Sequence, residues 1–266
     1  MSISVSIVLF SNNYLAEDNE KRIILENCIR YVAREKLVKK IVLTDNSPKP
    51  FFDYLAEYSS KIIYKSYGKN LGYGKGHNKA RKFSKNEKYH LILNPDIIFE
   101  DNDLLKVLYQ YMENNSDISM VQPNITFPDG SNQFLCKRNP TFLAQFIRAF
   151  LPRFLFKKFN SYNNYYEMRD LAYKKDPVLS TYLSGCFMFC RRSSLDKVNW
   201  FFEKYFMYLE DADLTRSLSS VGKCVHLPNL NISHQWAKGS HKSFKLKFTA
   251  IKSFIIYSFK WGFKLY

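Results

Sequence analysis

Short apolar runs alternate with a helix-patterned segment through the first hundred residues of the chain. The runs are rich in β-branched and aromatic residues and have the length of buried strands: Ser4–Phe10, Lys40–Asp45, Lys61–Lys65 and Tyr89–Leu93. The segment Glu20–Lys36 has apolar positions at helical spacing. Such alternation predicts an α/β fold with a mostly parallel central sheet flanked by helices.

The second half of the chain is less regular. Tyr182–Cys190 is apolar and predicts a buried strand, and Glu210–Val221 predicts a helix that begins with acidic residues, as helix N-termini favour. Phe142–Phe159 mixes large apolar residues with arginine and lysine. His241–Tyr266 does the same with six lysines, and its phenylalanines and isoleucines recur at three- and four-residue steps.

Polar clusters follow three of the predicted strands. They are Ser11–Asn13, Asp45–Ser47 and Asn94–Asp96. Ligands of parallel sheets bind outside the carboxyl ends of the strands, so we expect these loops to form one cleft.

Composition narrows the class of protein. With 266 residues and 46% apolar residues, the chain can bury the core of one large domain. The net charge of +16 and the 17% of aromatic residues suit an anionic membrane surface or single-stranded nucleic acid. The five cysteines contain no CxxC pair and suit a reducing compartment, with Cys186 and Cys190 as small buried hydrophobic residues. We expect no signal peptide, because the first apolar run lacks a basic segment before it, and no spanning helix.

A glycine-rich segment, Gly68–Asn78, precedes a predicted helix. It is neither a Walker A loop nor a Rossmann fingerprint, but it offers backbone N–H groups and two lysines. Such a segment suits a diphosphate. A flexible loop is the alternative, and the neighbouring polar clusters favour the diphosphate.

The turn Asn94–Asp96 presents one carboxylate at a strand end. Mg²⁺ and Mn²⁺ prefer oxygen ligands and often share them with substrate phosphates, so Asp96 is a candidate metal ligand. An ordinary turn aspartate is the alternative.

Glu210 and Asp211 are adjacent acids after an aromatic run. One of them can position an acceptor while the other serves as a general base. The alternative is ordinary charge at a helix N-terminus, which we assign to the nearby Asp213.

Asn231–His241 contains three further candidates. His234 could bind a metal, Trp236 could frame an acceptor, and Lys238 could meet a phosphate. A single histidine is more often structural, and His77 and His234 are the two that we separate from the rest.

Seven segments, taken in order, resemble the family 2 inverting glycosyltransferases, and among them bacterial rhamnosyltransferases of surface polysaccharide assembly. The segments are SIVLF, VLTDNS, GKNLGYGKGHN, LILNPD, SGCFMFCRR, FMYLEDADLTR and ISHQWAKGS. The resemblance covers about residues 3 to 241.

The resemblance implies a GT-A fold, a divalent cation (Mg²⁺ or Mn²⁺) and a role for each motif residue. Asp211 would be the base beside Glu210, and Asp96 with His234 would hold the metal, although Asn94 stands where the family carries an acid. The donor would contact Phe10, Ser11, Asn13, Asp45, Asn70, Gly72, Tyr73, Gly76, Asn78, Asn94 and Lys238. The acceptor would contact Gly185, Cys186 and Trp236.

We therefore predict an enzyme that transfers L-rhamnose from dTDP-L-rhamnose to a saccharide on a polyprenyl diphosphate, in O-antigen synthesis. The catalytic domain is expected over residues 1–240. Residues 241–266 are expected to form a basic amphipathic helix on the cytoplasmic face of the bacterial plasma membrane, with packing on the protein's own core as the alternative.

Two other hypotheses stay open at this point. A UDP-hexose or UDP-galactofuranose could be the donor. A basic nucleic-acid-binding protein is the alternative outside the enzymes, but its charge should line the cleft, whereas here the basic and aromatic residues gather outside it. We expect no nucleic-acid partner.

Overall fold

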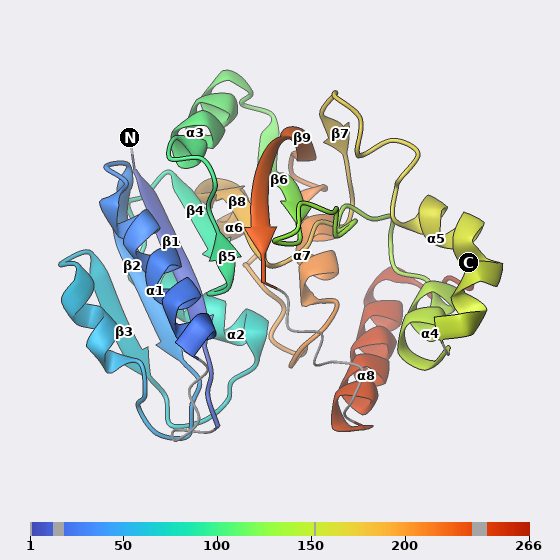
Figure 1. The fold of residues 1–266 in the computed structure, drawn as a ribbon, viewed down its shortest axis with the longest axis horizontal. Helices are drawn as coiled ribbons and strands as arrows, with labels where there is room; N and C mark the ends of the chain where they lie inside the picture. Colours follow the sequence, from blue (N-terminus) through green and yellow to red (C-terminus); the bar gives the residue numbers. More distant parts are fainter. Residues whose placement is uncertain (1, 13–18, 152, 236–243) are drawn as a thin grey trace.

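The centre of the molecule is one twisted sheet with helices packed around it (Figure 1). The computed structural model describes residues 2–12, 19–151, 153–235 and 244–266. Within these residues, eight strands follow the order β3-β2-β1-β4-β8-β6-β9-β5, and β7 pairs with β9. The α/β class and the mostly parallel sheet predicted from the sequence are confirmed.

The N-terminal half of the sheet is parallel. Its strands are β1 (Ile3–Leu9), β2 (Val38–Asp45), β3 (Ile62–Ser66) and β4 (Tyr89–Leu93). All four were predicted, with ends that differ by two residues at most. The helices and 3₁₀ turns of this half are α1 (Asn19–Arg34), η1 (Asp53–Tyr58), α2 (Tyr73–Asn78), η2 (Lys79–Lys82) and α3 (Leu104–Asn114).

The second half of the sheet mixes directions. β8 (Phe187–Arg191) runs antiparallel to both β4 and β6 (Ile118–Thr126), and β9 (Lys223–His234) runs parallel to β6. The short strands β5 (Ile97–Ile98) and β7 (Val178–Leu179) pair antiparallel with β9.

The strand predicted over Tyr182–Cys190 begins only at Phe187. Its first half leaves the sheet because the Gly185 N–H donates to Asp211 instead of to a neighbouring strand. The prediction was wrong there, and the turn that replaces the strand belongs to the site described below.

The helices of the second half lie partly beside the sheet and partly at one end of the molecule (Figure 1). They are α4 (Phe142–Phe150), η3 (Arg153–Phe159), α5 (Asn160–Tyr166), α6 (Arg192–Lys197), α7 (Glu210–Leu218) and α8 (Phe244–Trp261). None of the helices in the described residues is long and apolar enough to cross a membrane.

One face of α8 packs on the domain. Asp213 of α7 is buried and accepts hydrogen bonds from Lys260 Nζ at 2.9 Å and Trp261 Nε1 at 2.5 Å. Ser253 Oγ donates to the Met207 carbonyl oxygen at 2.7 Å, and Tyr257 is buried. The structural role predicted for Asp213 is therefore confirmed.

The other face of α8 is exposed and apolar. It carries Phe248, Ile251, Ile255 and Phe259, and Phe263 follows the helix. Phe142 and Phe146 of α4 continue this surface, because the Phe142 ring lies 6.0 Å from the Phe263 ring, centroid to centroid. We call these seven side chains the α4–α8 apolar face. The apolar stripe predicted over residues 241–266 is therefore mostly exposed, whereas Phe254 is partly buried against the domain. The Phe244 side chain lies outside the described residues.

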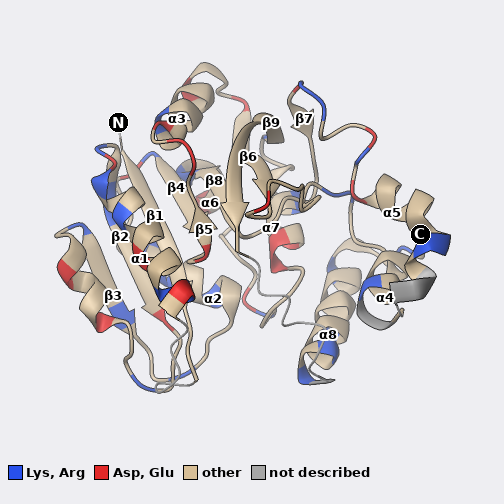
Figure 2. Cartoon of the chain, in the orientation of Figure 1, with Lys and Arg blue, Asp and Glu red and all other residues tan. Residues whose placement is uncertain are grey.

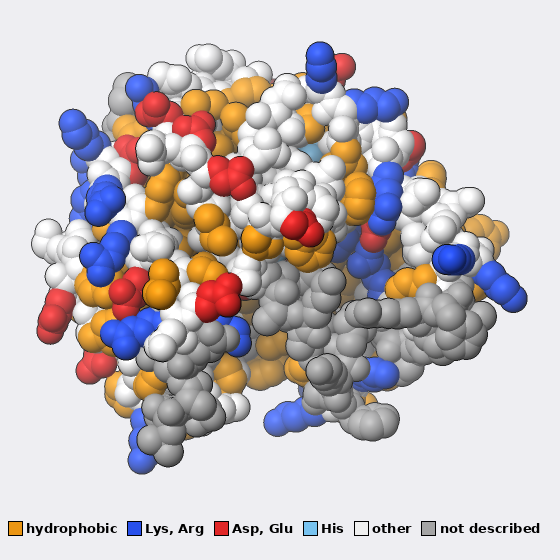
Figure 3. Space-filling model, viewed as in Figure 1, with side chains coloured by type: hydrophobic (Ala, Val, Ile, Leu, Met, Phe, Trp, Pro, Cys, Tyr) orange, Lys and Arg blue, Asp and Glu red, His pale blue; other side chains and the backbone are white. Residues whose placement is uncertain are grey.

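Basic side chains are spread over the molecule. Figure 2 shows Lys and Arg on the first strands and helices as well as on α4 and α8. On the face drawn in Figure 3, the described Lys and Arg side chains lie mainly toward the two ends, with Asp and Glu among them. This distribution differs from the single basic groove that a nucleic-acid-binding protein would need.

Candidate active site

The loops that follow β1 and β2 meet, as their place at the same edge of a parallel sheet predicts. The Asn46 N–H donates to the Leu9 carbonyl oxygen at 2.8 Å, and the Ser11 N–H donates to Ser47 Oγ at 2.9 Å. Phe10 is exposed beside them. Asn13 lies outside the described residues.

Asp45 shapes the second of these loops. Its carboxylate is fully buried and accepts hydrogen bonds from the Ser47 N–H at 2.8 Å, the Phe51 N–H at 3.0 Å and the Tyr64 hydroxyl at 2.6 Å. A contact between Asp45 and a nucleoside remains a prediction, and it would replace one of these bonds.

The glycines of the Gly68–Asn78 segment serve close packing. Gly72 has φ +84°, and a Cβ there would lie 2.3 Å from the Phe206 carbonyl oxygen. A Cβ on Gly74 would lie 2.9 Å from Phe201, and one on Gly76 would lie 2.8 Å from Val8. The segment is therefore wedged between β1 and the 201–206 loop.

Asn70 fixes the turn that enters this segment. Its Oδ1 accepts a hydrogen bond from the Gly72 N–H at 2.9 Å, and Asn46 Nδ2 donates to the Gly72 carbonyl oxygen at 3.1 Å. Two strand-end loops are thus joined through Gly72.

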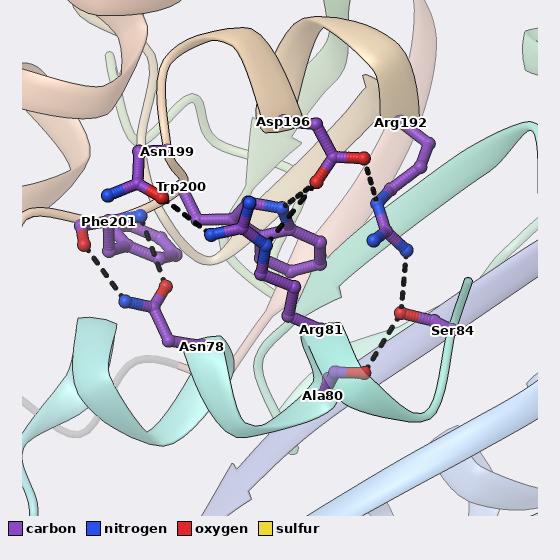
Figure 4. Close-up of polar contacts among 9 residues, drawn as sticks. All are labelled: Asn78, Ala80, Arg81, Ser84, Arg192, Asp196, Asn199, Trp200 and Phe201. Atoms are coloured by element: carbon purple, nitrogen blue, oxygen red, sulfur yellow. Dashed lines mark hydrogen bonds and ion pairs between the residues drawn. The ribbon is translucent and has the colours of Figure 1, made fainter.

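A polar network holds α2 against the loop after α6 (Figure 4). Asn78 accepts from the Phe201 N–H at 3.1 Å and donates to the Phe201 carbonyl oxygen at 2.9 Å. Asp196 accepts from Arg192 Nε at 3.0 Å and Trp200 Nε1 at 2.9 Å, and it lies 3.4 Å from Arg81 Nε. Because both ends of its amide are used, Asn78 positions the loop, and its predicted donor contact is not tested.

His77 lies in the core. It is fully buried with its Nδ1 2.7 Å from Ser6 Oγ, and burial lowers its pKa to about 3. The imidazole therefore stays neutral, and the structure gives His77 a packing role.

Asp211 is fixed by the turn at Gly185. Its Oδ2 accepts a hydrogen bond from the Gly185 N–H at 3.0 Å, and its Oδ1 accepts one from the Ala212 N–H at 2.8 Å. The Tyr73 hydroxyl in turn donates to the Gly185 carbonyl oxygen at 2.5 Å. Gly185 and Tyr73, both predicted as site residues, are thus brought to the same carboxylate.

The two adjacent acids differ in their surroundings. Burial, and after it the negative charge of Asp211, raises the pKa of Glu210 to about 8. Burial also raises the pKa of Asp211, but the Gly185 N–H and the Lys137 ammonium oppose the rise. The negative charge of the pair is therefore better stabilised on Asp211, while Glu210, with its pKa raised to about 8, keeps its proton at neutral pH.

Strained backbone places these acids. Tyr208 and Leu209 have φ values of 74° and 63°, so two consecutive non-glycine residues adopt the left-handed conformation. Such strain persists only where surrounding packing imposes it, and Leu209 is buried against α7 and Tyr257.

His234 and Asp96 face each other at the ends of β9 and β4. His234 Nε2 lies 3.2 Å from Asp96 Oδ1, and the histidine side chain is 7% exposed. Its Nδ1 lies 3.1 Å from Gln133 Oε1. Gln133 Nε2 donates to the Thr126 carbonyl oxygen at 3.0 Å and the His234 carbonyl oxygen at 2.7 Å, which fixes the orientation of the amide. Nδ1 therefore carries a hydrogen, and Nε2 points toward Asp96 and lies 3.4 Å from Asn94 Nδ2.

This pair fits a divalent cation. Asp96 Oδ1 is buried and has no hydrogen-bond partner among the described residues. A carboxylate oxygen and an imidazole lone pair repel each other unless a cation or a proton lies between them. The described residues contain no cluster of three His, Cys, Asp or Glu side chains, so the remaining ligands would have to be water, Asn94 or the donor.

A single turn connects the acid pair with the metal pair. The Asn94 N–H donates to the Cys186 carbonyl oxygen at 2.8 Å, while the Gly185 N–H binds Asp211. Burial raises the pKa of the Cys186 thiol, and the charges of Asp96 and Asp211 raise it as well, so that it is about 12. The Gly185–Cys186 turn therefore lies between the two groups, and the thiol stays neutral.

Sequence reasoning missed Gln133 and Lys137. Both lie in the loop after β6, where no motif or periodicity marks them. Lys137 is 7% exposed and lines a cavity of about 690 Å³ that begins at Glu210 and Asp211. Trp236 and Lys238, predicted for the acceptor and the donor, lie outside the described residues.

Three comparisons relate this site to known proteins. The glycosyl transferase family 2 model matches residues 19–198. Rhamnosyltransferase WbbL of Escherichia coli (strain K12) is 29% identical over 217 residues, which cover 77% of this chain and 75% of that protein. The N-acetylglucosaminyl-diphospho-decaprenol L-rhamnosyltransferase of Mycobacterium tuberculosis (strain CDC 1551 / Oshkosh) is 33% identical over 116 residues, 43% of this chain and 36% of that protein.

Solved structures share the fold. Mannosyltransferase PcManGT from Pyrobaculum calidifontis, in complex with GDP-Man and Mn²⁺, aligns with a TM-score of 0.60 over 96% of this chain and 63% of that one, at 11% identity. The GT-A fold expected from the sequence is therefore confirmed. This chain spans less than two thirds of the mannosyltransferase structure and 36% of the mycobacterial relative.

Proposed function

The chain belongs to glycosyl transferase family 2 and is a glycosyltransferase, and we propose that it moves L-rhamnose from dTDP-L-rhamnose to a saccharide hydroxyl. The names of two relatives support this donor, since both are rhamnosyltransferases. The mycobacterial name also specifies a sugar-diphospho-decaprenol, which supports a polyprenyl-diphosphate-linked acceptor. We place the reaction in surface polysaccharide synthesis of the O-antigen type.

The acid pair carries this proposal. Asp211 is ionised and held by two backbone N–H groups, and it lies at the inner end of a cavity large enough for a saccharide. Its carboxylate takes the proton of the acceptor hydroxyl. The hydroxyl oxygen then attacks the anomeric carbon opposite the leaving nucleoside diphosphate, so the configuration inverts. Glu210, protonated, can donate a hydrogen bond to the acceptor.

The metal pair supports the donor side of the same reaction. Asp96 Oδ1 and His234 Nε2 would hold Mg²⁺ or Mn²⁺, which offsets the charge of a nucleoside diphosphate. Gln133 keeps Nε2 of His234 directed into the site. The loops at Ser11, Asp45 and Asn70 would surround the nucleoside.

The α4–α8 apolar face supports a location at a membrane. Its exposed side chains lie beside lysines of α8, and anionic headgroups attract such lysines by about 1 kcal/mol each. We propose that this face rests on the cytoplasmic leaflet of the plasma membrane, where a polyprenyl-linked acceptor would be presented.

A donor screen tests the proposal. The melting temperature is measured with dTDP-L-rhamnose, a UDP-hexose and UDP-galactofuranose, each with Mn²⁺ and with chelator. We expect the largest rise with dTDP-L-rhamnose and Mn²⁺, and a much smaller Mn²⁺-dependent part in Asp96→Ala. A larger rise with a UDP-sugar would replace the donor. Equal rises with Mn²⁺ and with chelator would show that donor binding does not need a metal.

A further inference from the structure

A cavity of about 690 Å³ extends from the acid pair to the helices at the end of the molecule. Glu210 and Asp211 line its inner end, and side chains of α4, α5 and α8 line the rest. Figure 2 shows acidic residues at the start of α7 and basic residues along α4 and α8.

Lys137 is a buried cation in this cavity. It is 7% exposed, so its ammonium group is almost entirely withdrawn from water. The ammonium group lies over the Tyr182 ring, 5.0 Å from its centroid. Burial and the charge of Arg148 lower the pKa of Lys137 to about 8. Such a buried ammonium is unfavourable unless an anion joins it.

Arg148 adds positive charge at the same wall. It pairs with Glu167, which also accepts from Arg169 Nε at 2.8 Å, so two guanidinium groups share one carboxylate. Arg148 Nε is buried without a partner among the described residues. Lys137, Arg148 and Arg169 together outnumber the two carboxylates that interact with them, Glu167 and Asp211.

The cavity opens onto the α4–α8 apolar face. Phe142, Phe146 and Ile251 line the cavity and are 43%, 43% and 41% exposed, so the same side chains form its mouth and the outer surface. From inside to outside, the cavity therefore offers a general base, a cationic wall and an apolar exit.

We infer that Lys137 and Arg148 bind the diphosphate of a prenyl-diphosphate-linked acceptor, whose lipid leaves the cavity over the α4–α8 apolar face. This inference rests on the proposed function, because it specifies the acceptor of the same reaction. An amphiphile with a hydroxyl, a diphosphate and an apolar chain matches the three parts of the cavity in their order. The donor diphosphate belongs at Asp96 and His234, beyond the Gly185–Cys186 turn.

The test uses farnesyl diphosphate as the probe and titration calorimetry as the readout. Chelator is present throughout, so that no metal can hold the probe at Asp96. We expect wild type to bind farnesyl diphosphate at least 10-fold more tightly than farnesol. Lys137→Met should weaken the diphosphate roughly 10- to 100-fold, and Lys137→Arg should retain most of the affinity. Lys106→Met, an exposed lysine of α3, is the matched control and should bind as wild type does.

Arg148→Gln provides a second measurement, with its folding checked by circular dichroism. Equal affinities for farnesol and farnesyl diphosphate, or an unchanged affinity in both Lys137→Met and Arg148→Gln, would overturn the inference. The proposed function is judged separately by wild-type donor binding with Mn²⁺. If wild type binds the donor with Mn²⁺, but Lys137→Met and Arg148→Gln leave the affinity for farnesyl diphosphate unchanged, only the inference is overturned and the proposed function stands.

Discussion

Glu210 and Asp211 are neighbours in the sequence, but the fold treats their carboxyl groups differently. Glu210 Oε2 is buried without a hydrogen-bond partner among the described residues, whereas both oxygens of Asp211 accept backbone N–H groups. A pair of acids whose environments separate their pKa values can divide the roles of proton donor and base. The family resemblance pointed to Asp211 as the base, and the Gly185 turn supplies a physical reason, because it stabilises the anion of Asp211 and not that of Glu210.

Asp211→Asn tests the base. The amide keeps the size of the side chain but cannot take a proton, so turnover should fall by roughly two to four orders of magnitude while donor affinity stays within about twofold. Initial rates and donor titrations measure the two quantities. Turnover close to that of wild type would remove Asp211 from the role.

Glu210→Gln tests whether Glu210 is protonated in the folded protein. The pKa of Glu210 is raised from its ordinary value of 4.5 to about 8, so its contribution to stability is full below pH 4.5 and is lost as the pH rises toward 8. The melting temperature of wild type should therefore fall between pH 5 and pH 8 more steeply than that of Glu210→Gln. Glu57→Gln, at an exposed position, should follow wild type. Parallel curves for all three proteins would contradict a protonated Glu210.

At the scale of elements, close packing explains the glycines at and within the start of α2, which are Gly72, Gly74 and Gly76. Gly72 and Gly130 both have φ near +80°, but only Gly72 lies against another backbone segment. Alanine substitutions at these two glycines therefore separate the cost of left-handed backbone strain from the cost of steric overlap.

Gly72→Ala should cost roughly 2–5 kcal/mol of stability, because left-handed strain adds to overlap with the Phe206 carbonyl. Gly130→Ala should cost about 1–2 kcal/mol, since nothing lies within 4 Å of its Cβ. Urea denaturation of both variants measures the difference. Equal costs would show that the 201–206 loop yields to the added methyl group.

Local patterns predicted the elements that carry their own signal. β1 to β4, α1 and the acidic start of α7 follow apolar runs, helical periodicity and N-terminal acids, and they were found close to their expected ends. β6 was not predicted from the sequence, and β8 begins late because Gly185 bonds across to α7. Asn78 and His77 were singled out for chemistry, yet their partners Phe201 and Ser6 are more than 70 residues away in sequence. Contacts at such separation leave no local pattern.

At the scale of the whole molecule, α8 has features of both hypotheses made for residues 241–266, which are binding to a membrane surface and packing on the protein's own core. One face packs through Tyr257 and the Asp213 bonds, and the other face remains apolar and exposed. Removing the helix would leave Asp213 buried without its partners, so substitutions on the outer face isolate the membrane question better than a truncation.

Vesicle flotation tests this face with Phe248→Ser, Ile255→Ser and Phe259→Ser combined. Wild type should float with anionic vesicles, and the triple variant should bind roughly 100-fold or more weakly, because three large side chains no longer enter the lipid. Ile23→Ser, Leu171→Ser and Leu179→Ser, combined, change three exposed apolar residues elsewhere and should leave flotation intact. Equal flotation of the two triple variants would contradict a membrane role for α8.

The stereochemistry of sugar release tests the central claim, a metal-assisted single displacement aided by Asp211, most directly. Wild-type enzyme is mixed with Mn²⁺ and dTDP-L-rhamnose, and proton NMR follows the first sugar formed by slow hydrolysis, before the anomers equilibrate. The claim predicts that the first product has the anomeric configuration opposite to the donor and that chelator suppresses its formation. A first product with the donor's own configuration would contradict it, because a side chain would then have bonded to the sugar before water did.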